Sequence, residues 1–249
     1  MNTSSIVRFA ALPLLLASLV AQEPAWLTKV EALVAGRLAK PDAVGLSVAI
    51  AQRGEVLLSK GYGLAEAEFE VPATATTMFR IGSITKQFTA AAIMRLIEQQ
   101  KLSLDDPLSK FVPDFPTQVS PKGKPVTIRN LLNHSSGIPS YTELGESWQK
   151  LQPLELSHQE LLALVAGKPF DFEPDTDWHY NNTGYYLLGM VLEQVHGKSY
   201  AQVVHDELCA PLELAHTRYD VSSELIKGRA QGYGEKNGVL RNDEPLGMS

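Results

Sequence analysis

The chain has 249 residues, of which 44% are hydrophobic and 20% charged, with a net charge of -6 and one cysteine, Cys209. This composition is typical of a globular protein, and the length accommodates one large domain or two interleaved ones. The acidic balance and the lack of a basic block argue against nucleic acid as a partner. A single cysteine supplies neither an internal disulfide nor a thiolate cluster for a structural metal.

The N-terminus predicts a secretory signal peptide over residues 1–21. Arg8 precedes a short apolar run that ends in small residues at Ala21, as signal peptides do. The run is too short for a comfortable membrane span, although an uncleaved N-terminal anchor is the alternative. We therefore expect a secreted or periplasmic protein of the cell envelope, with its domain over residues 22–249 and no membrane span after cleavage.

The first part of the domain, residues 22–82, is expected to hold a helix and a β-hairpin. Residues 25–39 carry apolar side chains at helical spacing. Residues 44–51 alternate bulky and small side chains, which is typical of a strand, and residues 55–60 are the expected returning strand. Residues 61–78 are expected to be mostly irregular.

The second part, residues 83–220, is predicted to be mostly helical. Its longest helix is expected over 83–99, and shorter ones over 128–133, 158–166, 185–196 and 200–208, with Thr127, Ser157 and Ser199 as capping residues. Residues 239–241 are the late strand candidate. This order of elements predicts an α+β fold, in which two strands alone make no stable sheet.

A serine and a lysine stand three residues apart where the longest helix begins. Ser83 and Lys86 share a helix face at this spacing, and Ser-x-x-Lys is a signature of acyl-enzyme chemistry. A lysine in a dry site helps to remove the serine proton. Ser147 and Lys150 repeat the spacing, but they stand in a polar segment, so the first pair is the candidate; a plain helix cap is the alternative for Ser83.

A second set of candidate residues lies in the loop before the predicted helix 185–196. Tyr180 and Asn182 form a Tyr-x-Asn triplet that occurs once in the chain. A tyrosine acts as a general base where cationic neighbours lower its pKa. The Asn182 amide can accept a hydrogen bond from Lys86 and donate one to a substrate carbonyl. An aromatic plug with an asparagine cap is the alternative interpretation.

Three segments together resemble one family. They are Phe79 to Phe88, then Thr127 to Pro139 with its His-Ser-Ser-Gly run, and then Tyr180 to Gly189. In order and context, over about residues 25–240, the chain resembles the serine β-lactamase and penicillin-binding-protein family, in the branch of class C β-lactamases, D-alanyl-D-alanine carboxypeptidases and related esterases. The resemblance implies a β-lactamase/transpeptidase-like fold, an α/β sandwich with an all-helical subdomain.

The resemblance also implies roles for the candidate residues. Ser83 would be the acylated nucleophile, Lys86 would hold the proton network beside it, and Tyr180 would be the base for acylation and deacylation. Asn182 would orient the substrate, and the Ser83 N–H would form half of an oxyanion hole. The family uses no metal or other cofactor. His134, in the shared His-Ser-Ser-Gly run, is interpreted as structural.

Two features depart from the family pattern. The middle residue of the Tyr-x-Asn triplet is usually Ser or Ala, whereas here it is Asn181. The family's third motif, Lys-Thr-Gly or His-x-Gly on a late strand, has no good match; Lys236-Asn237-Gly238 comes too early and in a polar turn. We therefore expect a C-terminally truncated sequence in which the last strands of the sheet are missing.

The expected function is that of a secreted serine hydrolase acting through an acyl-enzyme on Ser83. Its substrate would be a small molecule or a peptidoglycan-like compound: an ester, a D-amino-acid peptide or a β-lactam, with the first two favoured. The alternative is a non-catalytic, truncated family member that binds a ligand or is inactive.

Overall fold

The computed structural model describes residues 24–116, 119–221 and 223–243. The expected signal peptide, residues 1–21, lies outside the described residues. The chain divides into two compact units, Met1–Lys40 and Pro41–Ser249. The described part of the first unit is essentially one helix, α1 (Ala25–Leu38), with Pro24 at its N-cap in an extended conformation. This helix confirms the one predicted over residues 25–39.

The second unit begins with an antiparallel sheet in the order β1-β2-β3. Strand β1 (Gly45–Gln52) pairs with β2 (Glu55–Glu66) from Gly45 opposite Gly63 to Gln52 opposite Glu55. The bulky side chains Leu46, Val48 and Ile50 are half-buried, whereas the small ones between them are exposed. The hairpin predicted from the alternating pattern is therefore confirmed.

The prediction that residues 61–78 are mostly irregular is wrong at its start. Strand β2 runs on to Glu66, and β3 (Val71–Pro72) pairs with its end. Glycine permits this, because a Cβ at Gly61 would lie 2.3 Å from the backbone of Ala73, and one at Gly45 would lie 2.0 Å from the Leu64 carbonyl oxygen. The glycines that weaken the strand pattern in the sequence are the ones that let the backbones approach.

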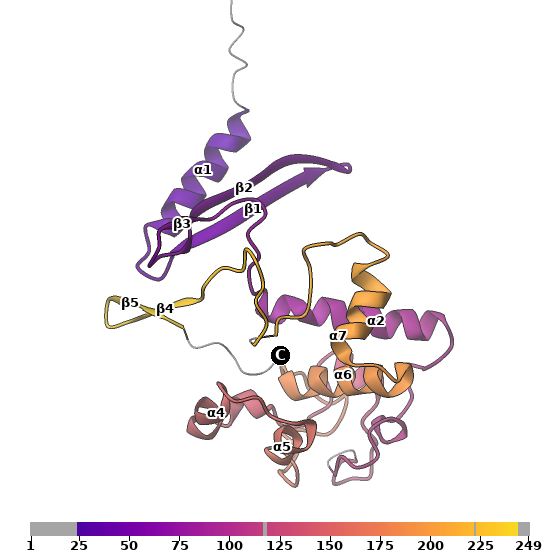
Figure 1. The fold of residues 1–249 in the computed structure, drawn as a ribbon. Helices are drawn as coiled ribbons and strands as arrows, with labels where there is room; N and C mark the ends of the chain where they lie inside the picture. Colours follow the sequence, from indigo (N-terminus) through magenta and orange to yellow (C-terminus); the bar gives the residue numbers. More distant parts are fainter. Residues whose placement is uncertain (1–23, 117–118, 222, 244–249) are drawn as a thin grey trace, which may run out of the picture. The chain divides into compact units, whose positions relative to one another are not determined.

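The apolar core lies among the helices of the second unit, whose ribbons are drawn in Figure 1. Helices α2 (Thr85–Glu98), α6 (Asn182–His196) and α7 (Tyr200–Val204) pack against one another, and α3 (Ile128–Leu132) packs on α6. The contacts are mainly apolar, although the Thr89 hydroxyl of α2 lies 2.8 Å from the Tyr200 hydroxyl of α7. The largest fully buried side chains of the core are Phe115, Ile93, Leu96, Leu108, Ile128, Leu131, Ile138, Leu161, Leu187, Leu188, Leu192 and Val126. This core holds the ends of α2 and α6 in fixed positions.

Two helix starts differ from the sequence prediction. Residues Gly82–Ile84 form a 3₁₀ turn, and the α-helix begins only at Thr85. Helix α6 begins at Asn182, three residues before the predicted start, because the Asn181 side chain caps it by accepting from the Gly184 N–H at 2.7 Å. With 15 residues against 14 for α2, α6 is the longest of the described helices.

The remaining helices are short. The capping boxes of Thr127 and Ser157 are present, at α3 and at α5 (His158–Ala163), so both predicted starts are confirmed. Ser199 caps α7, which continues as a π-helical turn over His205–Cys209. Residues 146–151 form a further helix, α4 (Glu146–Leu151), and 3₁₀ turns occupy Leu108–Lys110 and Tyr141–Glu143.

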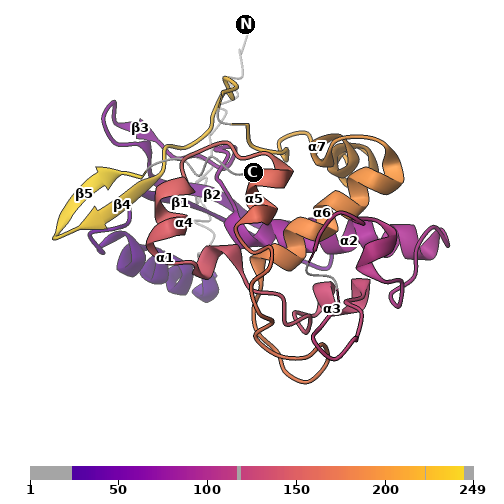
Figure 2. The ribbon, with the colours of Figure 1, turned by 90° about the horizontal axis from the view of Figure 1, so that it is seen from below.

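The late strand candidate forms a hairpin of its own. Strand β5 (Val239–Asn242) pairs with β4 (Tyr233–Lys236) in a separate two-stranded sheet (Figure 2). The turn between them uses Asn237 and Gly238 with φ of 57° and 78°. Strand β4 is tied to the rest of the unit, because the hydroxyl of its first residue, Tyr233, accepts from the Ala67 N–H at 2.7 Å. Lys236-Asn237-Gly238 therefore lies at a hairpin turn, as the sequence predicted.

Candidate active site

The turn that carries Ser83 presents its side chain to solvent. Gly82 has a φ of +51°, in the left-handed region that glycine adopts most readily, and Ser83 is exposed. One turn later the Lys86 Nζ lies 3.4 Å from the Ser83 Oγ. The predicted meeting of the two side chains therefore occurs, although at the long end of a hydrogen bond.

Tyr180 reaches the same serine from the loop before α6. Its hydroxyl lies 2.7 Å from the Ser83 Oγ, and the two residues are 97 positions apart in the chain. The Lys86 Nζ lies over the Tyr180 ring, 4.6 Å from its centroid, and 5.6 Å from the centroid of the Tyr185 ring. Rings near a cation stabilise its charge, so the lysine is held between two aromatic faces.

Asn182, the first residue of α6, completes the group. Its Oδ1 accepts from Lys86 Nζ at 2.6 Å, which is the contact that the sequence predicted. Its Nδ2 donates to the Thr142 Oγ1 at 2.8 Å. These two contacts set the orientation of the amide, because the lysine requires the acceptor Oδ1 and the threonine hydroxyl accepts from the donor Nδ2. Thr142 stood in no sequence motif, and only the fold brings it here.

The contacts of Asn181 explain why an asparagine can stand where the family usually has Ser or Ala. The side chain is buried, and besides capping α6 it donates from Nδ2 to the Ile138 carbonyl oxygen. The backbone N–H of Asn181 donates to the His134 Nδ1 at 3.1 Å. One asparagine thus joins the loop after α3 to the start of α6, and it holds Tyr180 on one side and Asn182 on the other.

The three tyrosines around the site have different acidities. Burial raises the pKa of Tyr180, but hydrogen bonding to Lys86 and Ser83 and the charge of Lys86 outweigh it, so this pKa is lowered. Burial and the neighbouring Tyr180 raise the pKa of Tyr141 to about 12 and also raise that of Tyr185. Groups whose environments move their pKa values apart are acid–base candidates, and among these three the candidate is Tyr180.

The backbone of the Ser83 turn offers a donor to a ligand. The first hydrogen bond of the turn is donated by Ile84 to the Ile81 carbonyl oxygen at 3.1 Å. The Ser83 N–H precedes that bond, and amides at the start of a helical turn have no partner within it. Backbone N–H groups of this kind are the donors from which oxyanion holes are built.

Residues other than the four predicted ones shape this site. His134, Thr142 and Tyr185 contact the quartet of Ser83, Lys86, Tyr180 and Asn182. Of these three residues, the sequence had singled out His134, through the His-Ser-Ser-Gly run that the family shares.

Among the residues that the structure describes, no cluster of His, Cys, Asp or Glu could hold a metal ion, and no helix is long and apolar enough to span a membrane.

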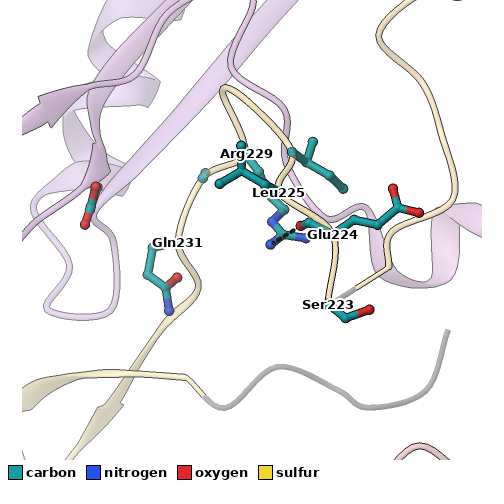
Figure 3. Close-up of a pocket in the computed structure, with 8 residues that line it drawn as sticks. Ser223, Glu224, Leu225, Arg229 and Gln231 are labelled. Atoms are coloured by element: carbon teal, nitrogen blue, oxygen red, sulfur yellow. Dashed lines mark hydrogen bonds between the residues drawn. The ribbon is translucent and has the colours of Figure 1, made fainter.

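A pocket away from the quartet is less suited to chemistry. It has a volume of about 410 Å³ and is lined by residues that include Glu66, Leu225, Arg229 and Gln231 (Figure 3). The Arg229 guanidinium is engaged by its own segment, with hydrogen bonds to the Asp220 carboxylate at 2.6 Å and to the Glu224 carbonyl oxygen at 3.4 Å. The guanidinium is therefore already ion-paired within the chain, with a carboxylate that also pairs with Arg80.

Comparison with known proteins identifies the family. The family model described as Beta-lactamase matches residues 30–249, so this chain belongs to the β-lactamase family, the superfamily of β-lactamase and penicillin-binding-protein-like serine hydrolases. The protein flp of Staphylococcus aureus (strain MW2) is 32% identical over 206 residues, which are 82% of this chain and 41% of that protein. The fold class expected from the sequence is thereby confirmed.

Two solved structures are similar to the chain. The octameric penicillin-binding protein homologue from Pyrococcus abyssi has a TM-score of 0.76 and 35% identity, covering 89% of this chain and 51% of that one. EstCE1, a hydrolase with promiscuous acyltransferase activity, has a TM-score of 0.74 and 28% identity, covering 87% of this chain and 58% of that one. The chain thus spans about half the length of the relatives that it matches.

Proposed function

We propose that the protein is a serine hydrolase that works through an acyl-enzyme on Ser83. The observation that carries this proposal is the convergence of Tyr180 and Lys86 on one exposed serine, with 2.7 Å and 3.4 Å to its Oγ. A serine becomes a useful nucleophile when a base lies within hydrogen-bond reach. Membership of a family of serine hydrolases supports the same reading.

In the proposed acylation step the Ser83 Oγ attacks a substrate carbonyl carbon and its proton passes to the ionised Tyr180. The Ser83 N–H stabilises the oxyanion, and Tyr180 returns the proton to the leaving alcohol or amine as the C–O or C–N bond breaks. In the second step Tyr180 takes a proton from water, whose oxygen attacks the ester carbonyl and releases Ser83 with its proton restored. Lys86 remains positively charged and favours the ionised form of Tyr180.

We propose an ester as the first substrate class to examine. EstCE1, whose described activities are hydrolysis and acyl transfer, resembles 87% of the length of this chain. An ester needs less help for departure of its leaving group than an amide, so a site with one basic tyrosine suits it. D-Amino-acid peptides and β-lactams are the other classes that an acyl-enzyme of this kind accepts, and Asn182 would orient their amide groups.

The experiment is a substrate panel on the full chain: p-nitrophenyl esters, a D-alanyl-D-alanine peptide and a chromogenic cephalosporin, each with the Ser83→Ala variant as control. The proposal predicts ester turnover that requires Ser83. Turnover of the β-lactam far above the ester would keep the acyl-enzyme but change the substrate class. Binding without turnover of any of the three would favour a non-catalytic family member.

We also propose that the protein is exported to the cell envelope. The support is the apolar run that ends at Ala21, which has the form of a signal peptide. Fractionation of cells that express the native gene, with N-terminal sequencing of the mature protein, tests this. Mature protein that begins at Gln22 in the periplasm or medium is the expected result, and an intact N-terminus in the cytosol would overturn it.

A further inference from the structure

His134 holds the residues on both sides of Tyr180. Its carbonyl oxygen accepts from the His179 N–H at 3.1 Å, and its ring Nδ1 accepts from the Asn181 N–H at 3.1 Å. The two amides that flank Tyr180 in the chain therefore both donate to one residue. The position of the tyrosine backbone is thereby set from the loop after α3.

The ring of His134 also supports the tyrosine side chain. It lies 4.8 Å from the Tyr180 ring and 5.1 Å from the Tyr185 ring, tilted by 38° and 36°, and Trp178 closes a third side edge-on at 6.0 Å. Tyr180 and Tyr185 are the two rings over which the Lys86 ammonium lies. The imidazole is therefore packed between the two aromatic groups that hold the lysine.

The hydrogen bond from Asn181 defines the tautomer of the ring. Because Nδ1 accepts, it carries no proton, and a neutral imidazole then has its proton on Nε2. Protonation of Nδ1 would replace the acceptor with a donor facing the Asn181 N–H, and this contact would be lost. The arrangement seen here is therefore available only to the neutral side chain.

The surroundings keep the ring neutral. The charged or titratable groups that face it are Lys86 from α2, Tyr180 from the loop and Tyr185 from α6. Burial and the positive charge of Lys86 both lower the pKa of His134 below its ordinary value of 6.5. A second cation beside Lys86 is unfavourable, so the ring takes up its proton only in acid.

The backbone of His134 is in an unusual conformation. Its φ is 63°, in the left-handed region that residues other than glycine adopt at some cost in free energy. That conformation lets the carbonyl oxygen meet His179 while the ring meets Asn181. Asparagine tolerates the same φ, and its Oδ1 lies near the place of a histidine Nδ1.

We propose that His134 is a positioning residue for Tyr180, and that its neutral ring, protonated on Nε2 alone, keeps the tyrosine hydroxyl against Ser83. The inference rests on the proposed function, since Tyr180 is the base of that reaction. If His134 must be neutral, the acylation rate should depend on a second ionisation on the acid side of its pH profile. Below the pKa of His134 both this ring and Tyr180 must lose a proton before acylation proceeds.

The kinetic test compares three variants in pre-steady-state acylation by a p-nitrophenyl ester over a range of pH. His134→Leu removes the acceptor, and we expect an acylation rate about 100-fold lower, as a misplacement of about 1 Å costs, with little change in KM. His134→Asn keeps an acceptor that does not titrate, so we expect recovery to within about tenfold of the native rate. His205→Asn, at an exposed histidine beside Asp206, is the matched control.

The shape of the pH profile separates positioning from folding. For the native protein the slope of log rate against pH is expected to rise from about one to about two below the pKa of His134, whereas His134→Asn keeps a slope of about one. A native rate in His134→Leu, or an unchanged acid limb in His134→Asn, would overturn the proposal.

A nuclear magnetic resonance measurement decides the matter independently of activity. Imidazole ¹⁵N shifts of the full chain are expected to show an unprotonated Nδ1 on His134 and a pKa below 6.5, and the Tyr180 ring signals should shift more in His134→Leu than in His134→Asn. A protonated Nδ1, or unmoved Tyr180 signals, would refute the positioning role. If neither the ester, the D-alanyl-D-alanine peptide nor the cephalosporin acylates the native protein while these shifts appear, the proposed function fails and the positioning stands.

Discussion

The Tyr180 hydroxyl lies 2.7 Å from the Ser83 Oγ, whereas the Lys86 Nζ lies 3.4 Å from the same atom. The lysine is closer to Asn182, at 2.6 Å. The tyrosine is therefore the group best placed to take the serine proton, and the lysine is best placed to supply charge. This division of roles leads to separate predictions for each side chain.

Replacement of the serine tests the nucleophile, and the chain carries its own control. Ser83→Ala should abolish the burst of product from a p-nitrophenyl ester, because no oxygen remains to be acylated. Ser147→Ala alters the serine of the other Ser-x-x-Lys pair, which is an exposed residue of α4. Its burst should equal that of the native chain. A burst that survives in Ser83→Ala but not in Ser147→Ala would reverse the assignment.

Replacement of the lysine tests its electrostatic role. Lys86→Met removes the charge that lowers the pKa of Tyr180, so the tyrosine should ionise at a higher pH, as followed by ultraviolet difference spectroscopy. Because less Tyr180 is then ionised at neutral pH, we expect the acylation rate there to fall by at most about 10²–10⁴-fold, the usual worth of the general base that the lysine keeps ionised. Lys150→Met is the control, and an equal loss in that variant would contradict the account.

The pH dependence of acylation should report Tyr180. Its lowered pKa means that the ionised form increases as pH rises through that value, so the rate should rise with pH with a midpoint below pH 10, the ordinary value for tyrosine. Tyr180→Phe has no group to ionise. Its residual rate should be about 10²–10⁴-fold lower and should lack this rise. The same rise in Tyr180→Phe would show that another group is the base.

Thr142 should set the orientation of the Asn182 amide. Thr142→Val removes the acceptor of the Nδ2 donor, so the amide can turn and present the wrong atom to Lys86. We expect a loss of about tenfold in acylation rate, the equivalent of one hydrogen bond. Thr142→Ser retains the hydroxyl and should retain the rate. Equal rates in the two variants would show that the amide is held by other contacts.

Gly137 should be sensitive to any side chain. It has a φ of +70°, and a Cβ would lie 1.9 Å from the Phe172 carbonyl oxygen; Gly145 has a φ of +59° with nothing within 4 Å. Both alanine variants strain the backbone, but only Gly137→Ala also displaces a neighbour. Its free energy of unfolding should fall by about 1–3 kcal/mol more than that of Gly145→Ala. Equal urea midpoints would contradict the close approach.

Much of this fold could be predicted from the sequence because it depends on residues that are close together in the chain. The capping boxes at Thr127 and Ser157 depend on residues three positions apart, and the hairpin after α1 depends on alternation. The spacing of Ser83 and Lys86 likewise brings them together within one turn. Such features need no knowledge of the rest of the fold.

The features that the sequence did not reveal depend on distant contacts. The extension of β2 needs Gly61 to meet Ala73, and the early start of α6 needs Asn181 to act as a cap as well as a link to Ile138. The contact of Thr142 with Asn182 joins residues 40 positions apart. No periodicity or motif encodes these pairs, because each partner is ordinary in its own segment.

The most direct test of the acyl-enzyme is to find the covalent adduct. The full chain is incubated with an alkyl fluorophosphonate, digested and mapped by mass spectrometry, with Ser83→Ala and Ser147→Ala in parallel. The account predicts one modified residue, Ser83, in the native chain and in Ser147→Ala, and no adduct in Ser83→Ala. An adduct on a different serine, or an adduct that persists in Ser83→Ala, would contradict the assignment of Ser83 as the nucleophile.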